Sequence, residues 1–326
     1  MAGLCDPWHR QINYLRVSVT DFCNLNCVYC SEEPVPRLPM SEILTYEEIG
    51  RLISVASAIG ITKVRFTGGE PFLRPQFSKL VAMTAKTPGI DDISATTNGT
   101  LLARYAGELK EAGLNRVNVS LDTLRPDRFK QITRSDSLEQ VIAGIELADR
   151  VGLTPVKINM VVMRGKNDDE IVDFARKTIE NGWNIRYIED MPFGNPANGV
   201  DSMVSAREIQ KRIEVLGRLE PCGTKRGNGP ARYFRFPNAS GTIGFISPVT
   251  EHFCGTCNRL RITADGHLRP CLLDDDEIDV KEALRSGASD DELRELIEQA
   301  VSVKRERHHL NEGQRAPVKS MRQIGG

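Results

Sequence analysis

Strand and helix patterns alternate along the first 195 residues of the chain, and this alternation leaves few folds open. Six segments have the short, alternating pattern of strands: Tyr14–Thr20, Lys63–Thr67, Ile93–Thr97, Arg116–Leu121, Val156–Val162 and Ile185–Asp190. Helix patterns lie between them and stop close to a glycine: Tyr46–Ile59, Leu101–Ala112, Leu138–Val151 and Asp169–Glu180. Strands that alternate with helices of this length predict a parallel sheet of right-handed βαβ units.

Each predicted strand is apolar on one face only. Val64 and Phe66, for example, alternate with Arg65. Parallel strands are normally apolar on both faces, and a closed barrel fills its interior with branched apolar side chains. Here the second face carries cations instead: Arg16, Lys63, Arg65, Lys157 and Arg186. We therefore predict a partial (β/α)6 barrel, open on one side, whose interior holds a large anionic ligand. A sheet with one solvated face is the alternative.

The pattern changes after residue 195, which predicts two domains, 1–195 and 196–326. The second part predicts a smaller α+β region with a helix near Ala206–Leu216 and two strands, Arg232–Phe236 and Thr242–Ile246. Ala264-Asp265-Gly266 indicates a hairpin between Arg259–Thr263 and His267–Pro270. Helices are expected near Asp279–Leu284 and Asp291–Val303.

Six of the eight cysteines form two groups of three: Cys23, Cys27 and Cys30, and Cys254, Cys257 and Cys271. The sequence has no signal peptide pattern and no apolar run of membrane-spanning length, so we expect a cytoplasmic protein without disulfides. An odd number of cysteines in each group also disfavours disulfide pairing. We interpret Cys5 and Cys222, which have no cysteine neighbour, as free thiols.

Three thiolates leave one ligand position open on a metal centre. A structural zinc site needs four ligands, and His252 or His267 could complete the second triad, so a Cys3His zinc site is one interpretation of that triad. The first triad has no such histidine nearby. The other interpretation is a four-iron, four-sulfur cluster with one iron free for an exogenous ligand.

Two motifs stand after neighbouring predicted strands. Cys23-x3-Cys27-x2-Cys30, with Tyr29 before its last cysteine, follows the first strand, and Gly68-Gly69-Glu70-Pro71 follows the second. Together they resemble the radical S-adenosylmethionine (SAM) superfamily. The resemblance implies a [4Fe–4S] cluster whose open iron binds the amino and carboxylate groups of SAM. One-electron reduction would then cleave SAM to a 5′-deoxyadenosyl radical.

Motifs in the second half of the sequence indicate which family of this superfamily the chain resembles. Phe245-Ile246-Ser247-Pro248-Val249, the run from Cys254 to Arg261, Gly229-Pro230 and the terminal Gly325-Gly326 resemble the GTP 3′,8-cyclase family from about Tyr14 to the last residue. That resemblance implies a lyase that converts GTP to (8S)-3′,8-cyclo-7,8-dihydroguanosine 5′-triphosphate, the first step of molybdenum cofactor biosynthesis. The radical would abstract the ribose C3′ hydrogen, and a second [4Fe–4S] cluster would bind the guanine.

The resemblance also implies roles for individual residues. GTP contacts would come from Arg16, Arg65, Thr96, Lys157, Arg259 and Arg261. The SAM site would be lined by Tyr29, Gly69, Ser120 and Met191. Gly325 and Gly326 would enter the site and assist catalysis, although a frayed terminus is the ordinary expectation. From spacing alone, Arg259 and Arg261 share one strand face and can reach one polyphosphate together.

Charge excludes some partners. Lys and Arg total 43 against 44 Asp and Glu, a net charge of −1, so nothing global attracts nucleic acid or a membrane. The resemblance implies GTP as substrate, a one-electron reductant and a following enzyme, cyclic pyranopterin monophosphate synthase, and it allows a homodimer. We interpret the basic run from Lys304 to His309 as a solvated helix end.

Two other functions remain open from the sequence. One is a different radical SAM enzyme with an auxiliary cluster, such as a peptide maturase, which would not need Arg259 and Arg261. The other is a zinc-stabilised nucleic-acid module, whose binding would fall steeply with salt.

Overall fold

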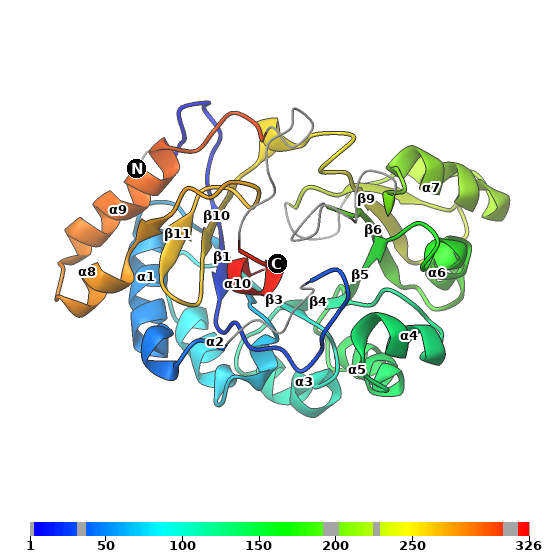
Figure 1. The fold of residues 1–326 in the computed structure, drawn as a ribbon, viewed down its shortest axis with the longest axis horizontal. Coiled ribbons are helices and arrows are strands. Elements are labelled where there is room, and N and C mark those ends of the chain that lie inside the picture. The colour runs from blue at the N-terminus through cyan, green and yellow to red at the C-terminus, as the bar shows by residue number, and fades with distance from the viewer. Residues whose placement is uncertain (1–2, 31–36, 192–201, 224–228, 309–318, 326) are drawn as a thin grey trace.

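The computed structural model describes residues 3–30, 37–191, 202–223, 229–308 and 319–325. A curved sheet forms its centre, with helices packed on the convex side (Figure 1). The strands are β1 (Tyr14–Ser18), β2 (Lys63–Thr67), β3 (Asp92–Thr97), β4 (Arg116–Ser120), β5 (Lys157–Val162), β6 (Asn184–Glu189), β7 (Glu220–Pro221), β8 (Arg232–Arg235), β9 (Thr242–Ile246), β10 (Arg259–Ile262), β11 (His267–Arg269) and β12 (Ile278–Asp279).

The sheet is open and mostly parallel. Its strand order is β12-β11-β10-β1-β2-β3-β4-β5-β6-β9-β8-β7, with β1 to β6 side by side in chain order. β10 joins β1 in parallel and β9 joins β6 in parallel, whereas the outer strands pair antiparallel. The predicted partial α/β barrel is confirmed. Strands from residues 220–279 extend both edges of this barrel, and the proposed boundary at 195/196 lies outside the described residues.

The helices are α1 (Tyr46–Ala58), α2 (Phe77–Ala85), α3 (Leu102–Glu111), α4 (Pro126–Thr133), α5 (Leu138–Arg150), α6 (Ile171–Glu180), α7 (Ala206–Ile213), α8 (Lys281–Arg285), α9 (Asp290–Ser302) and α10 (Met321–Ile324). The predicted helices are present with ends shifted by up to three residues. α2 was not predicted because it lacks a capping signal: Gln76 precedes it in a left-handed conformation, with φ 59° and no side-chain cap.

Local sequence explains where the longer helices begin and end. Thr45 and Glu48 form a capping box at the start of α1, and Ser289 and Glu292 form another at the start of α9. Gly60 follows α1 with φ 116°, which a residue with a Cβ atom rarely adopts.

The alternation along the strands separates a core from a polar interior. Val17, Phe66 and Val119 are fully buried in the apolar core between sheet and helices. We expect truncation of Phe66 to alanine to cost about 3–5 kcal/mol, the usual range for a buried phenylalanine. The opposite strand faces point to the concave side, where α10 lies (Figure 1).

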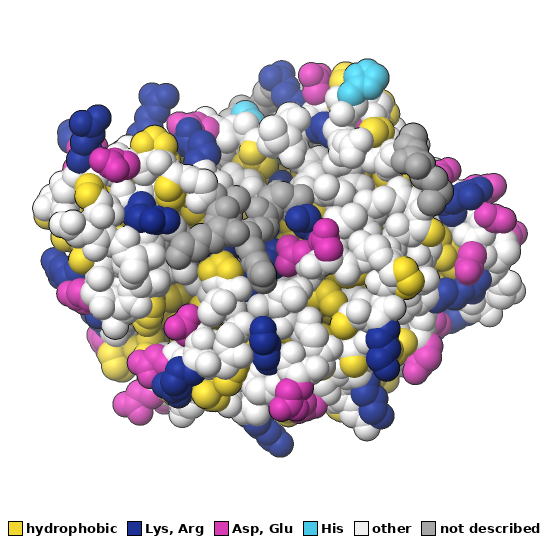
Figure 2. All heavy atoms as spheres, turned by 180° about the vertical axis from the view of Figure 1, so that it is seen from behind, with side chains coloured by type: hydrophobic (Ala, Val, Ile, Leu, Met, Phe, Trp, Pro, Cys, Tyr) yellow, Lys and Arg dark blue, Asp and Glu magenta, His cyan; other side chains and the backbone are white. Residues whose placement is uncertain are grey.

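The outer surface carries charges of both signs. Figure 2 shows Lys and Arg side chains interspersed with Asp and Glu over the back of the molecule, with no continuous basic face in that view. None of the described helices has the length and apolarity needed to cross a membrane.

Candidate active site

One cavity of about 310 Å³ occupies the concave side of the barrel and joins the two cysteine triads. Cavities of this size are typical of small-molecule sites. Most of the predicted site residues line it: Cys23, Cys27, Cys30, Cys254, Cys257, Cys271, Tyr29, Gly69, Ser120, Met191, Arg16, Arg65, Thr96, Arg259 and Arg261. Thus segments more than 200 residues apart in the sequence meet at one site.

The first triad lies in the loop after β1, and the glycine pair after β2 supports that loop. Gly69 N donates to Thr20 O at 2.7 Å, and Glu70 N donates to Phe22 O at 2.8 Å. A Cβ atom on Gly69 would lie 2.3 Å from Phe22 O. We therefore infer that the glycine allows two backbones to pack together directly before Cys23, in addition to exposing backbone to a ligand.

Among the described residues, a backbone N–H, an amide and the Tyr29 hydroxyl donate to the first triad. Cys23 Sγ accepts from Leu25 N at 3.4 Å and from Asn98 Nδ2 at 3.6 Å. Burial, with a smaller effect of Glu70, raises the pKa of Cys23 to about 11. Burial and the nearby Asp122 also raise the pKa of Cys27.

Asp122 is a site residue that the sequence analysis did not assign. Its Oδ2 accepts from Tyr29 Oη at 2.7 Å, and its Oδ1 accepts from Val161 N at 2.8 Å. Burial raises the pKa of Asp122 to about 6. The carboxylate fixes Tyr29 beside the cysteines, and its place on the polar face after β4 was the only sequence signal.

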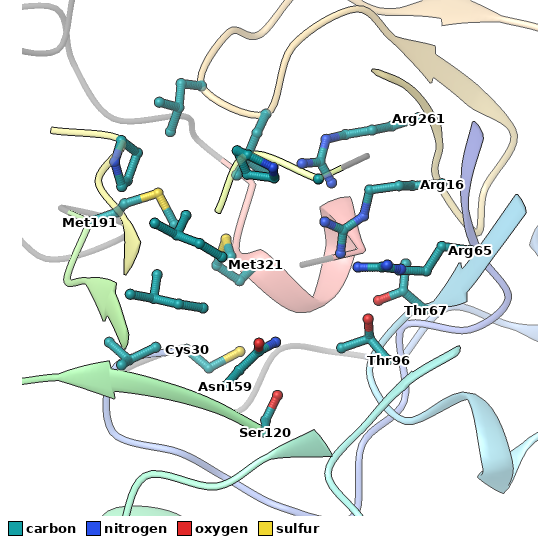
Figure 3. Close-up of a pocket in the computed structure, with 18 of the residues that line it drawn as sticks. Arg16, Cys30, Arg65, Thr67, Thr96, Ser120, Asn159, Met191, Arg261 and Met321 are labelled. Atoms are coloured by element: carbon teal, nitrogen blue, oxygen red, sulfur yellow. The ribbon is translucent and has the colours of Figure 1, made fainter. Parts of the chain in front are cut away.

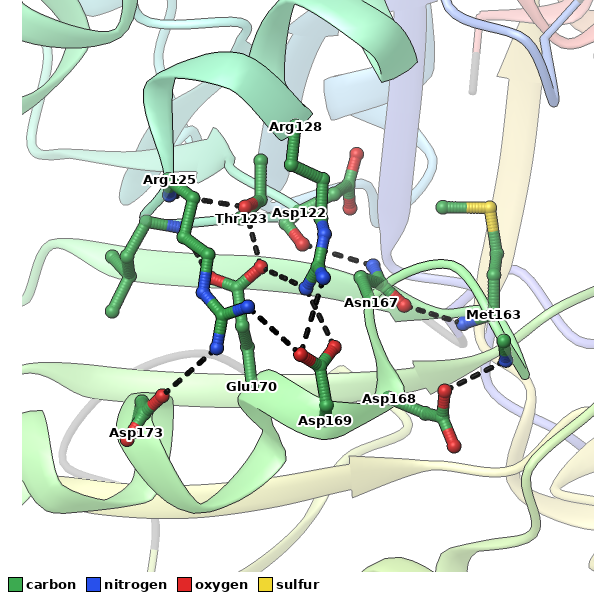
Figure 4. A network of polar contacts seen from close by, with 12 residues as sticks. Asp122, Thr123, Arg125, Arg128, Met163, Asn167, Asp168, Asp169, Glu170 and Asp173 are labelled. Carbon is green, nitrogen blue, oxygen red and sulfur yellow. Dashed lines mark hydrogen bonds and ion pairs between the residues drawn. The ribbon is translucent and has the colours of Figure 1, made fainter.

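A polar network behind Asp122 holds the loops after β4 and β5 together (Figure 4). Asn167 Nδ2 donates to Asp122 O at 2.9 Å and to Val161 O at 2.8 Å. The buried Glu170 accepts from Thr123 Oγ1 at 2.5 Å and from Arg128 Nη1 at 2.6 Å. Fully satisfied buried networks of this kind reduce the freedom of the loops that they join.

The second triad lies among cations. Cys254 and Cys257 flank a short turn before β10, and Cys271 follows β11. Burial would raise the pKa of Cys257, but attraction to Arg259 and Lys304 and hydrogen bonds from Arg259 lower it to about 6. Arg259 Nη2 donates to Cys257 Sγ at 3.5 Å.

Two histidines flank this triad. His252 Nδ1 lies 3.0 Å from His308 Nε2, and the ligand atoms of His252, Cys254 and His308 all lie within 4.8 Å of one another. His267 instead pairs with Asp265, with its Nδ1 3.3 Å from Oδ1. A zinc ion bound by Cys254 would therefore use His252 and His308, and not His267.

A row of arginines forms one wall of the cavity. Arg261, Arg16 and Arg65 are direct partners across β10, β1 and β2, and Figure 3 shows their side chains pointing into the cavity. Burial lowers the pKa of Arg16 and repulsion by Arg261 adds to this; burial and Arg259 lower the pKa of Arg261 to about 10. Cations this close and this buried favour an anionic ligand.

Further polar atoms in the wall fit a hydrogen-bonding ligand. Thr96 Oγ1, Asn159 Oδ1 and Arg186 Nε are buried and have no hydrogen-bond partner among the described residues. Arg186 is held by a hydrogen bond from Nη2 to Asn118 Oδ1 at 2.6 Å. A buried polar atom normally has a partner, so these atoms indicate where a polar ligand would bind.

Lys157 is near this wall but does not line the cavity. It is buried at the start of β5, with its Nζ 5.3 Å from the centre of the Tyr233 ring. Burial, followed by repulsion from Arg186, Arg116 and Arg65, lowers the pKa of Lys157 to about 6. Lys63, which shares this strand face, also does not line the cavity.

The C-terminal tail enters the barrel. Gly325 has φ 80°, and a Cβ atom there would lie 2.9 Å from Ser18 Cβ and 3.0 Å from Thr67 Cγ2. Its carbonyl oxygen lies 3.4 Å from Arg16 Nη2 and 3.5 Å from Arg261 Nη1. Gly326 lies outside the described residues.

The interpretation of residues 304–309 as a solvated helix end was wrong for two of them. Lys304 is 4% exposed and His308 is 8% exposed, while Arg305, Glu306 and Arg307 face solvent. The segment packs on the loops of the second triad, a contact that local charge patterns cannot reveal. His309 lies outside the described residues.

Family models match nearly the whole chain. The radical SAM superfamily model matches residues 17–178, and the Molybdenum Cofactor Synthesis C model matches residues 183–310. The GTP 3′,8-cyclase of Moorella thermoacetica is 50% identical over 322 residues, covering 98% of this chain and 99% of that protein. The GTP 3′,8-cyclase of Pelotomaculum thermopropionicum is 50% identical over 324 residues, with 98% and 99% coverage.

Solved structures show the same fold at low identity. Streptococcus suis SuiB bound to precursor peptide SuiA gives a TM-score of 0.62 at 14% identity, covering 98% of this chain and 77% of that one. SuiB bound to S-adenosylmethionine gives 0.60 at 16% identity, covering 83% and 63%.

Proposed function

The chain belongs to the GTP 3′,8-cyclase family of the radical SAM superfamily, and on this premise we propose that it converts GTP to (8S)-3′,8-cyclo-7,8-dihydroguanosine 5′-triphosphate in molybdenum cofactor biosynthesis. The observation that carries the proposal is the single cavity that joins two cysteine triads and a wall of arginines.

Each triad has the donor set for a [4Fe–4S] cluster with one open iron. Cys23, Cys27 and Cys30 would hold the first cluster, and Cys254, Cys257 and Cys271 the second. The hydrogen bonds to Cys23 Sγ and Cys257 Sγ suit bound thiolates, whose sulfurs accept hydrogen bonds in such sites. When bound, the first cluster and SAM supply the radical that removes the C3′ hydrogen of GTP.

The arginine wall would bind the triphosphate. Arg259, Arg261, Arg16 and Arg65 reach one region from three adjacent strands, which suits several charge-assisted hydrogen bonds to phosphate oxygens. Thr96 would donate to the nucleotide from the neighbouring strand β3. Lys157, behind this wall, would add positive charge once the triphosphate raises its pKa.

Other residues would hold SAM and exclude water. Tyr29, Gly69, Ser120 and Met191 line the same cavity, and Figure 3 places Met191 and Ser120 away from the arginines. Gly325 and Gly326 would complete the site from the tail. Enclosure between barrel and tail keeps water from reactive radicals and holds the two reactants in place.

Several partners follow from this function. We propose a one-electron reductant, cyclic pyranopterin monophosphate synthase as the recipient of the product, a homodimer, and location in the cytoplasm.

The decisive experiment is anaerobic purification with iron and sulfide counts, followed by incubation with SAM, GTP and a reductant. Two four-iron clusters predict about eight irons per chain. We expect GTP to accelerate formation of 5′-deoxyadenosine and a cyclised nucleotide to accumulate. If GTP leaves 5′-deoxyadenosine formation unchanged, the cyclase proposal is wrong; zinc with about four irons would instead support a zinc site at the second triad.

A further inference from the structure

Lys304 is a buried cation that the proposed reaction does not use. It follows α9 and is 4% exposed, and no ion pair among the described residues includes it. Its Nζ donates to Arg259 O at 3.2 Å and to Pro270 O. Burying an ammonium group is costly unless other groups compensate its charge. The burial of Lys304 therefore indicates that its side chain has a function at this place in the structure.

The two carbonyl groups belong to the two segments that carry the second triad. Arg259 is two residues after Cys257, and Pro270 directly precedes Cys271. One ammonium group therefore ties the Cys257 segment to the Cys271 segment.

The N-terminal segment holds Lys304 in place. Trp8 Nε1 donates to Lys304 O at 3.0 Å. Arg10 donates to Arg305 O at 2.6 Å, to Glu306 O at 2.8 Å and to Cys254 O at 2.8 Å. The same guanidinium thus joins the Lys304 segment to Cys254, the remaining cysteine of the triad, which limits how far the ammonium can move.

We propose that Lys304 is a positioning residue for the second cysteine triad: it fixes the spacing of Cys257 and Cys271 and raises the reduction potential of the iron–sulfur cluster bound there. The inference rests on the second cluster of the proposed function. A cluster becomes more negative when it is reduced, and a nearby buried cation stabilises that state.

The test compares the full-length wild-type protein with Lys304→Met, Lys304→Arg and the control Arg305→Gln. Arg305 is the neighbouring cation, but its side chain is 48% exposed and pairs with Asp274 at 2.7 Å. Iron and sulfide counts and a redox titration followed by electron paramagnetic resonance give the potential of each cluster. We expect Lys304→Met to shift the second cluster to a more negative potential and leave the first unchanged. In Lys304→Arg the potential of the second cluster should stay close to the wild-type value, and Arg305→Gln should not change it.

Each outcome decides the proposal. About eight irons in the wild type and an unchanged second potential in Lys304→Met would overturn the role of Lys304 and leave the cyclase function standing. About four irons in the wild type would overturn the second cluster and this inference together. If Lys304→Met loses the second cluster, recovery of about eight irons in Lys304→Arg supports the proposal, whereas equal loss in both overturns the role of the charge.

Discussion

The two cysteine triads line one cavity, yet their electrostatic surroundings are opposite. Carboxylates lie near the first triad: Glu70 and Asp122 add to the effect of burial in raising the pKa of Cys23 and Cys27. Cations lie near the second, where Arg259 and Lys304 bring the pKa of Cys257 down to about 6 against the effect of burial.

This difference matches the charges of the two proposed ligands. SAM carries a positive sulfonium, which negative groups attract, and GTP carries a triphosphate, which the arginine wall attracts. Identical ligand sets can therefore lie in surroundings of different charge, which suits binding of SAM beside the first triad and of an anionic nucleotide beside the second.

Removal of one cysteine from each triad should separate the two functions most completely. Cys27→Ala should abolish 5′-deoxyadenosine formation, because SAM has no cluster to bind. Cys271→Ala should retain SAM cleavage but stop cyclisation. Chromatographic analysis of both products checks this, and loss of SAM cleavage in Cys271→Ala would contradict the division into two sites.

Removing a charge from the arginine wall should weaken the binding of GTP and leave the binding of SAM unchanged. Arg261→Met should weaken GTP binding about 10- to 100-fold, the usual loss for a desolvated hydrogen bond to a charged group. Affinity for SAM should not change. Equilibrium binding to the anaerobic protein measures both constants, with Arg285→Met as the control, because Arg285 pairs with Glu48 on the outer surface. Equal weakening of SAM and GTP would show that the wall is not specific to one ligand.

We expect Lys157 to make GTP binding depend on pH. Its pKa is lowered to about 6, so above pH 6 it is mostly neutral in the free protein, and an approaching triphosphate raises that pKa. Binding at pH 8 should take up as much as about one proton, and affinity should fall by at most about tenfold per pH unit as pH rises. Calorimetry in buffers of different ionisation enthalpy measures the uptake, which Lys157→Met should remove. The same uptake in Lys157→Met would assign the proton to another group.

The histidines predict a difference in zinc affinity between the two triads in the protein without clusters. We expect this effect to be smaller than those above. Only the second triad has His252 and His308 within ligand distance, so zinc should bind there more tightly than at the first. His252→Ala should reduce zinc affinity several-fold, and His267→Ala should have little effect. Competition with a chromophoric chelator measures both, and equal losses would contradict the geometry.

Much of the barrel could be predicted because its signals are local. The βα order and the polar strand faces placed Arg16, Arg65 and Arg186 inside the barrel, and all three line the cavity, whereas Lys63 and Lys157 do not. Asp122 and Asn159 were on those same faces, but nothing local distinguished them from ordinary polar residues. Lys304 and His308 had no signal at all, because a basic run after a helix is usually solvated.

The sequence by itself determined the two triads, the alternation that makes an open barrel, and the family. The triads and the alternation depend on spacing and periodicity, which are properties of neighbouring residues, and the family followed from the resemblance of the motifs. Only the tertiary structure decided how β9 and β10 close on the two edges of the barrel, which brings Arg261 beside Arg16 and Lys304 against the second triad. Contacts between residues 45 to more than 200 positions apart come from packing, and their energies are absent from any local pattern.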